Sequence, residues 1–239
     1  MTSVSDSRFV FVKRHEAPWV KLCGVRDVAT ARSLATLKPD AIGLNFYSPS
    51  VRFVATPTAA EICRSLPTGI MPVGVFVNAP LDEIVGVAAD TGIAAVQLHG
   101  DEPPSLIAEL RAARPSLPVL KAWRVDAEDL SSLATFLQEC ARLGAAPDAI
   151  LIDAKVAGAY GGTGKTAPWE LLRNYDESWP PLILAGGLVP ENVADAISIT
   201  HPFGVDTAGG IESSAGVKDV QRAAAFIAAA RALAPRASH

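Results

Sequence analysis

Eight short apolar runs alternate along the chain with stretches of helical periodicity, and this alternation limits the possible folds more than any other feature. Short apolar strands of this kind are typical of a parallel sheet that is buried on both faces. Between the runs, apolar residues recur every three or four positions, as in the stripe of Leu81, Ile84, Val85 and Ala88 that ends at Gly92. The pattern permits a closed barrel or a doubly wound open sheet. The predicted strands are residues 19–23, 40–46, 71–77, 94–98, 117–123, 148–153, 181–185 and 203–207.

Two observations favour the closed barrel. No GxGxxG motif follows the first run, which weakens the dinucleotide-binding form of the open sheet. Eight strand–helix units is also the number that closes a barrel. We therefore predict an α/β fold, a single (β/α)8 TIM barrel. A chain of 239 residues without a Ser/Gly-rich linker fits one such domain. We assign residues 19–239 to the catalytic barrel and residues 1–18 to an N-terminal extension.

Composition and charge exclude several classes of partner. The formal net charge is −4 and no block of Lys and Arg stands out, which argues against a nucleic-acid partner. No apolar run approaches the ~18 residues that cross a membrane. Charged residues interrupt the first 18 positions, so a signal-peptide core is missing there. The three cysteines show no CxxC spacing, which favours a reducing cytoplasm. Cys63 and Cys140 share the apolar faces of predicted helices, and we expect both to be inert core thiols.

Two reactive side chains, Cys23 and Asp153, close the first and the sixth predicted strands. In a barrel the carboxyl ends of all strands meet at one mouth, so the thiol and the carboxyl can act as a base and an acid. A base needs the thiolate, and Lys21 should point to the same side of its strand and favour it. An acid needs a raised pKa, which burial supplies. The alternatives are a structural cysteine, and a helix cap or a partner of Lys155 for Asp153.

Four further polar residues follow predicted strands and are candidates for substrate binding. Arg52 can grip a carboxylate by paired hydrogen bonds, although a surface ion pair is also possible. Gln97 and His99 end the fourth strand, and His99 can position a substrate or bond to the backbone of a turn. Asp206 ends the eighth strand, where it can bind substrate hydroxyls or orient its loop.

Glycine-rich segments follow the last three strands. In barrels the loops after strands seven and eight frequently bind phosphate through backbone N–H groups, although glycine pairs also make simple tight turns. The segment 158–166 contains GGTGKT, but a nucleotide-binding P-loop requires glycine at position 159, which holds Ala159. We interpret this segment as a loop that covers a ligand. The candidate phosphate-binding residues are Gly186, Gly187, Gly209 and Gly210.

Several motifs in order give the chain a strong resemblance to the phosphoribosylanthranilate isomerase family of tryptophan biosynthesis. The motifs are KLCG, FYSPSVRFV, VGVFVN, VQLHGDE, ILIDA followed by GGTGKT, LAGGLVPENV and VDTAGGIE, and the resemblance runs from residue 20 to residue 219. It implies a barrel of the ribulose-phosphate-binding type. It also implies an isomerase, an intramolecular oxidoreductase of the aldose–ketose type.

The resemblance implies a role for each candidate. Asp153 would be the general acid and Cys23 the general base of an Amadori rearrangement of N-(5-phosphoribosyl)anthranilate to 1-(2-carboxyphenylamino)-1-deoxyribulose 5-phosphate. Arg52 would hold the anthranilate carboxylate, Asp206 would position the substrate, and the glycine loops would bind its phosphate. No metal or organic cofactor is expected. We expect a small phosphorylated substrate as the partner, a cytoplasmic location, and a monomer rather than an oligomer.

The chain also departs from the family pattern, and other functions compete. Ala208 and Gly209 stand where the family usually has two serines. If a serine hydroxyl assists phosphate binding in the family, that contact is missing here, while the backbone amides remain. A histidine-pathway sugar isomerase would carry an aspartate on the first strand, where this chain has Cys23. Indole-glycerol-phosphate synthase would need lysine and glutamate roles that these motifs do not match. A silent, ligand-binding barrel is opposed by the presence of both Cys23 and Asp153.

Overall fold

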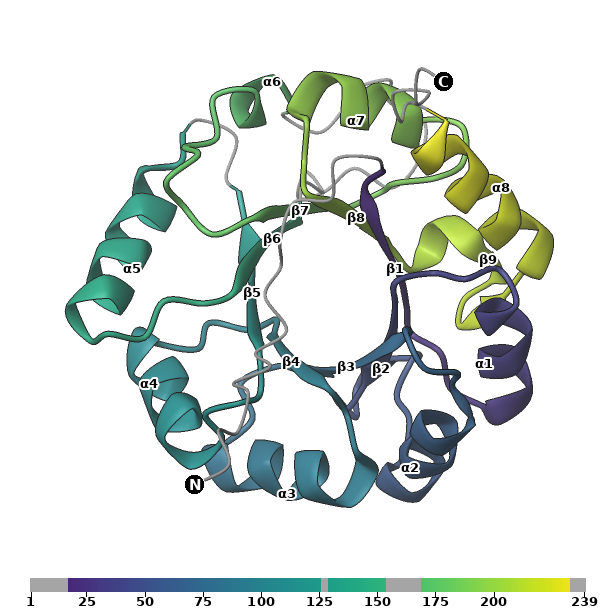
Figure 1. Cartoon of the computed structure of the whole chain (residues 1–239), viewed down its shortest axis with the longest axis horizontal. Coiled ribbons are helices and arrows are strands. Elements are labelled where there is room, and N and C mark those ends of the chain that lie inside the picture. The colour runs from purple at the N-terminus through teal and green to yellow at the C-terminus, as the bar shows by residue number, and fades with distance from the viewer. Residues whose placement is uncertain (1–16, 126–128, 154–168, 233–239) are drawn as a thin grey trace, which may run out of the picture.

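Eight parallel strands form a closed barrel in the computed structural model, which describes residues 17–125, 129–153 and 169–232. Each strand pairs with its neighbour in sequence, and β8 returns to pair with β1, so that the ring has no open edge (Figure 1). The predicted (β/α)8 barrel is therefore confirmed. The strands are β1 Trp19–Cys23, β2 Ala41–Asn45, β3 Met71–Phe76, β4 Ala95–Leu98, β5 Val119–Arg124, β6 Ala149–Asp153, β7 Leu182–Ala185 and β8 Gly204–Thr207.

Helices surround the barrel on its outside and connect successive strands (Figure 1). The stripe predicted around Ile84 and Ala88 is buried in α3, and Gly92 ends that helix with a positive φ of 76°. A 3-10 turn η1, Gly209–Ile211, and a small hairpin of β9 and β10 lie between β8 and the last helix. The bounds are α1 Val28–Ala35, α2 Thr56–Ser65, α3 Leu81–Thr91, α4 Pro104–Ala113, α5 Ser131–Arg142, α6 Trp169–Leu172, α7 Val193–Thr200, α8 Val220–Arg231, β9 Glu212–Ser214 and β10 Val217–Lys218.

Alternation of side chains along each strand divides the core into two parts. One set points into the barrel, where Trp19, Leu151 and Ile183 pack together. The other set points outward against the helices, where it forms a larger cluster that includes Leu22 and Phe226. Because alternate residues share a face, the inward set continues to the carboxyl end of each strand and decides which side chains meet at the mouth.

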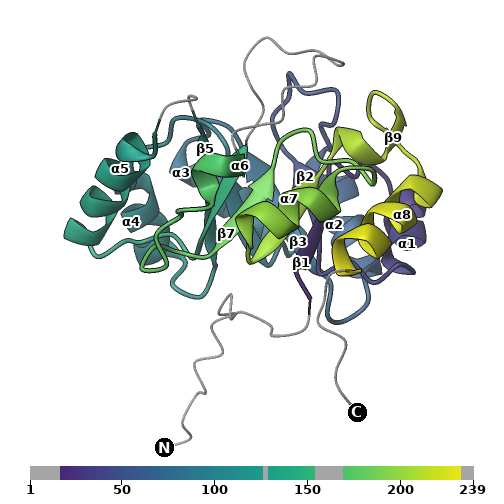
Figure 2. The ribbon, with the colours of Figure 1, turned by 90° about the horizontal axis from the view of Figure 1, so that it is seen from above.

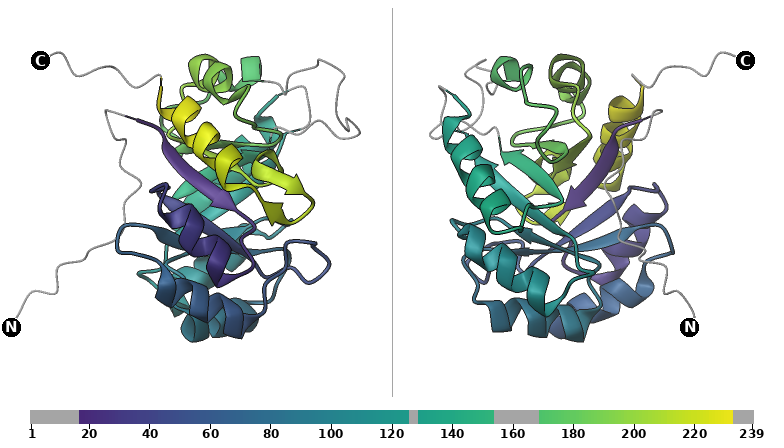
Figure 3. Two further views of the ribbon diagram at one scale, coloured as in Figure 1. Left: turned by 90° about the vertical axis from the view of Figure 1, so that its right-hand side faces the viewer. Right: turned by 60° about the vertical axis from the view of Figure 1, so that its left-hand side comes forward.

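The loops at the carboxyl ends of the strands gather on one side of the molecule. Figure 2 shows the loop between β2 and α2 and the hairpin of β9 on this side, and Figure 3 shows the same hairpin next to β1 and α8. None of the helices in the described part of the chain combines the length and the apolar character needed to cross a bilayer. The predicted extension up to residue 16 and the GGTGKT loop lie outside the described residues.

Candidate active site

A cavity of about 460 Å³ lies at the carboxyl ends of the strands. Strands β1, β6 and β8 contribute Cys23, Asp153 and Asp206 to its wall, and the loop after β2 contributes Arg52. The structure therefore brings together nearly all of the residues selected from the sequence, with Gln97 as the exception. The complete lining is Cys23, Asn45, Arg52, Val75, Val77, His99, Asp153, Ala185, Gly186, Gly187, Leu188, Val189, Asp206, Thr207, Ala208, Gly209 and Gly210.

Cys23 faces the barrel interior because it lies two and four residues after the inward-facing Lys21 and Trp19 on the same strand. Its register partner on β2 is Gly43, and a Cβ placed there would come within 2.6 Å of the Cys23 sulfur. Gly43 thus makes the space that the thiol occupies. Burial raises the pKa of the Cys23 thiol above its ordinary value, and the positive charges of Lys21 and Lys218 offset this only in part.

Lys21 and Asp206 form an ion pair below the thiol, where β1 and β8 lie side by side. The Lys21 Nζ is 3.0 Å from Asp206 Oδ1, and the lysine side chain is completely buried. Burial alone would lower the pKa of Lys21, but the charges of Asp206 and Cys23 outweigh it and raise the pKa. As predicted, the positive charge of Lys21 acts to lower the pKa of Cys23. Lys21 also pairs with Asp206, however, and burial keeps the pKa of Cys23 raised overall.

Arg52 pairs with a carboxylate of the protein itself. Its Nε and one terminal nitrogen each donate to Glu212, both at 2.7 Å, and Lys218 Nζ donates to the same carboxylate at 2.7 Å. Burial alone would raise the pKa of Glu212, but the hydrogen bonds from Arg52 and Lys218 outweigh it and lower the pKa to about 2. The ion-pair alternative for Arg52 is thus realised at the rim of the cavity, and the partner Glu212 was not among the predicted site residues.

His99 and Asp153 lie beside each other in the wall of the cavity, with His99 Nε2 3.8 Å from Asp153 Oδ2. Gln97 is fully buried beneath His99, and its amide nitrogen lies 2.6 Å from His99 Nδ1. When this amide donates to Nδ1, the ring carries its proton on Nε2, the nitrogen that faces Asp153. The structure thus places Gln97 behind the cavity wall, where it orients His99.

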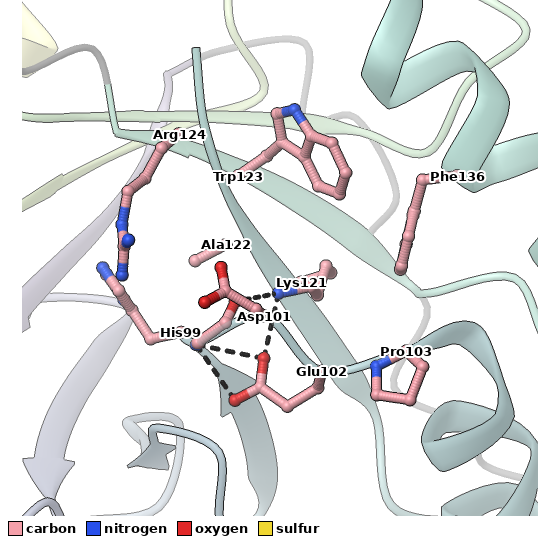
Figure 4. A pocket seen from close by; sticks show the side chains of 10 residues that line it. His99, Asp101, Glu102, Pro103, Lys121, Ala122, Trp123, Arg124 and Phe136 are labelled. Carbon is pink, nitrogen blue, oxygen red and sulfur yellow. Dashed lines mark hydrogen bonds and ion pairs between the residues drawn. The ribbon is translucent and has the colours of Figure 1, made fainter. Parts of the chain in front are cut away.

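A second cavity of about 420 Å³ adjoins the first and shares His99 (Figure 4). One side of it is a buried ion pair, in which Lys121 Nζ lies 3.0 Å from Glu102 Oε2. Lys121 also donates to the Gly100 carbonyl at 2.7 Å, and Glu102 accepts from the Gly100 N–H at 2.9 Å. These bonds fix the turn that directly follows His99, and they give Glu102, the last residue of the VQLHGDE motif, a structural role.

The glycine turns after β7 and β8 form another side of the first cavity. Gly186 and Gly187 have φ values of 86° and 68°, which residues with a side chain rarely adopt. Gly210 allows the two turns to touch, because a Cβ there would overlap the Leu188 carbonyl oxygen and come within 2.6 Å of Thr207 Oγ1. The two loops singled out from the sequence are thus in contact with each other.

We predict that Gly210→Ala lowers the free energy of unfolding by about 1–3 kcal/mol, the usual cost of forcing an extra methyl group into a packed site. Urea denaturation followed by circular dichroism measures this difference. The matched control is Gly86→Ala in α3, where an added Cβ meets nothing within 4 Å. Alanine is the better helix former, so the control should gain about 0.5–1 kcal/mol. Equal stability of the two variants would contradict the close contact at Gly210.

The closed barrel and the polar cavity at the carboxyl ends of its strands define the class of the protein, a TIM-barrel enzyme. Residues 20–229 match the family model of N-(5′-phosphoribosyl)anthranilate (PRA) isomerase, and the chain belongs to this family. The family predicted from the sequence motifs is confirmed, and with it an isomerase of tryptophan biosynthesis.

Curated relatives and solved structures agree with this assignment. The N-(5′-phosphoribosyl)anthranilate isomerase of Myxococcus xanthus is 40% identical over 215 residues, which cover 90% of this chain and 96% of that protein. The crystal structure of phosphoribosyl anthranilate isomerase from Thermotoga maritima superposes with a TM-score of 0.78 at 35% identity, covering 90% of this chain and 100% of that one. A further isomerase structure, in complex with reduced 1-(o-carboxyphenylamino)-1-deoxyribulose 5-phosphate, has a TM-score of 0.76 at 33% identity, with coverage of 90% and 100%.

Proposed function

We propose that Cys23 and Asp153 carry out the isomerisation as a general base and a general acid, on N-(5-phosphoribosyl)anthranilate as substrate. The observation that supports this assignment most strongly is that both residues line one cavity, together with Arg52 and the two glycine turns. Because the thiol and the carboxyl group lie on different strands of the barrel, one can remove a proton from a bound sugar while the other donates a proton to a different atom of it. The reaction then needs only proton transfers, and no metal or organic cofactor takes part.

In the first step Asp153 donates its proton to the furanose ring oxygen. The C1′–O bond breaks, the nitrogen lone pair forms the C1′=N bond, and the open-chain Schiff base carries a positive charge. In the second step the Cys23 thiolate removes the proton from C2′, and the electrons of that C–H bond form the enolamine. Tautomerisation to the ketone gives 1-(2-carboxyphenylamino)-1-deoxyribulose 5-phosphate. The positive charge of the Schiff base favours the thiolate when the base is needed, although burial of Cys23 opposes thiolate formation.

The rest of the cavity holds the substrate. The turns at Gly186, Gly187, Gly209 and Gly210 line one wall of the cavity, and we assign the phosphate to their backbone N–H groups. Asp206 binds the sugar, and His99 lies beside Asp153 and positions the reacting end. The relative solved with a reduced carboxyphenylamino deoxyribulose phosphate supports a ligand of this class.

Arg52 holds the anthranilate carboxylate. Its guanidinium carries five N–H donors, of which Glu212 uses two. Three donors remain, including the edge formed by the two terminal nitrogens, and this edge can pair with a second carboxylate. A terminal nitrogen lies 3.5 Å from the position of a Cβ on Gly209, which places it at the cavity wall. The contact with Glu212 and the contact with substrate are therefore compatible.

We predict that Arg52→Ala raises KM for phosphoribosylanthranilate by about 10- to 100-fold, in keeping with the loss of a charge-assisted hydrogen bond. The effect on kcat should be smaller, because the carboxylate is distant from the bonds that change. Steady-state kinetics with substrate generated in situ separates the two constants. Arg26→Ala is the control, since Arg26 donates to the Val51 carbonyl on the same loop and does not line the cavity. An unchanged KM for Arg52→Ala would remove Arg52 from the carboxylate site.

The assay for the reaction itself is the loss of phosphoribosylanthranilate fluorescence. Rapid loss with the wild-type protein supports the proposed substrate, and absence of turnover by folded protein would contradict it.

We further propose that residues 19–239 act as the catalytic domain in the cytoplasm, with residues 1–18 outside it. We also propose that the protein works as a monomer, and a mass of two chains would contradict this. Light scattering after size-exclusion chromatography measures the mass.

A further inference from the structure

The carboxylate of Glu212 lies between two cations at the rim of the cavity. It accepts from Nε and a terminal nitrogen of Arg52 on one side and from Lys218 Nζ on the other. Lys218 also donates to the Ala208 carbonyl at 2.9 Å, so this network is tied to the turn after β8. The side chains of Glu212 and Lys218 are only 5% and 1% exposed. A group held by three bonds within such surroundings has very little freedom to move.

The side of Arg52 that Glu212 occupies determines the side that remains for a ligand. Glu212 takes Nε and the neighbouring terminal nitrogen, which form one edge of the planar guanidinium. Within the described residues, the hydrogen bonds of the Arg52 guanidinium leave the edge between its two terminal nitrogens available. The stem of Arg52 is held as well, since its Cδ lies 2.5 Å from where a Cβ on Gly24 would be, directly after Cys23. The orientation of the guanidinium is thus set by contacts with the protein and is ready before a ligand arrives.

We propose that Glu212 is a positioning residue, which holds Arg52 so that the enzyme selects substrates carrying a carboxylate on the aromatic ring. This inference rests on the proposed role of Arg52 as the group that binds the anthranilate carboxylate. An arginine with a long flexible side chain loses conformational entropy when it grips a ligand. Fixing the side chain in advance removes this cost, so that the energy of the paired hydrogen bonds appears as affinity.

A different result is expected if Glu212 has a purely structural role and only stabilises the β9–β10 hairpin. Loosening the hairpin would weaken all ligands of the cavity alike, because the same segment follows the turn after β8. Positioning of Arg52 instead affects only ligands that carry the carboxylate. Two ligands that differ in this group alone therefore separate the two roles.

The experiment measures the dissociation constants of reduced 1-(o-carboxyphenylamino)-1-deoxyribulose 5-phosphate and of the corresponding phenylamino compound without the carboxylate. Isothermal titration calorimetry is applied to the wild type, Glu212→Gln and Arg52→Ala. We expect the wild type to prefer the carboxylated compound by about 10- to 100-fold, in the range of charge-assisted paired hydrogen bonds. Arg52→Ala should lose this preference, and Glu212→Gln should lose about tenfold of it while binding the phenylamino compound as the wild type does.

A matched control removes the same kind of pair elsewhere. Glu139 on α5 accepts from Nε and a terminal nitrogen of Arg142 at 2.8 and 2.6 Å, on the outer surface of the barrel. Glu139→Gln should leave both dissociation constants unchanged. Should Glu212→Gln fail to fold, Glu212→Asp replaces it, because aspartate keeps the charge and shortens the reach by one methylene. The same loss of preference is expected for it.

Each alternative result has a distinct meaning. An unchanged preference in Glu212→Gln, with the preference lost in Arg52→Ala, would overturn the positioning role and leave the proposed function intact. Equal weakening of both compounds in Glu212→Gln would also overturn it, in favour of a structural role. A preference that survives in Arg52→Ala would instead contradict the assignment of Arg52 to the carboxylate.

Discussion

Cys23→Ala is expected to lower kcat by about two to four orders of magnitude, the contribution that a positioned general base usually makes. The thiol lies at the floor of the cavity in the space that Gly43 leaves open, and alanine fills most of that space without a proton acceptor. Binding of the reduced product analogue should persist, because the glycine turns and Arg52 are unaffected. Loss of phosphoribosylanthranilate fluorescence measures turnover, and calorimetry measures binding.

The chain offers a matched thiol as the control. Cys63 lies half-buried on α2, and burial raises its pKa to about 11. Cys63→Ala removes a thiol from the outside of the barrel and should leave kcat unchanged. Near-normal turnover in Cys23→Ala would assign the base to another group, and loss of analogue binding in that variant would assign Cys23 to substrate binding instead.

The second large effect is expected at the opposite wall of the cavity. Asp153→Asn should lower kcat by a similar factor of about 10² to 10⁴, because an amide of the same shape cannot donate the proton that opens the furanose ring. The contact with His99 at 3.8 Å involves a carboxylate oxygen, so the amide also changes how the two side chains face each other. A pre-steady-state measurement should show normal binding followed by slow ring opening.

Asp148 supplies the comparison for this variant, since it directly precedes the same strand at its other end. Its carboxylate accepts from Arg111 at 2.8 Å and from the Val119 N–H at 2.7 Å. Asp148→Asn should reduce stability without changing kcat of the folded protein. If Asp153→Asn turned over at the wild-type rate, the acid would have to be another group of the cavity.

The fold could be predicted from the sequence because its signal is repeated along the whole chain. Each predicted strand matches an observed one to within one or two residues at its ends. The reason is that a strand buried on both faces appears in the sequence as a continuous apolar run. The inward direction of Cys23, Asp153 and Asp206 then follows from alternation alone. Cys63 and Cys140, expected to be inert, both have pKa values raised by burial to about 11.

The contacts between distant segments could not be predicted in the same way. Nothing in the spacing of Arg52 and Glu212 indicates a pair, because 160 positions separate them and only the return of β8 to β1 brings them together. Gln97 and His99 are two positions apart and so point to the same side of the sheet. The sequence does not show, however, that His99 reaches the cavity while Gln97 is fully buried behind it. The space for the Cys23 sulfur depends on Gly43, a residue of the neighbouring strand whose register is known only from the structure.

Closure of the ring by β1 and β8 has a consequence for how the protein acquires activity. Lys21 and Asp206, the groups beneath the thiol, come from the first and the last strands and are 185 positions apart. A chain that has formed every other strand pair still lacks this part of the cavity. Recovery of turnover after dilution from denaturant should therefore be slower than recovery of the helical circular dichroism signal. The rate at which activity returns would then measure the pairing of β1 with β8.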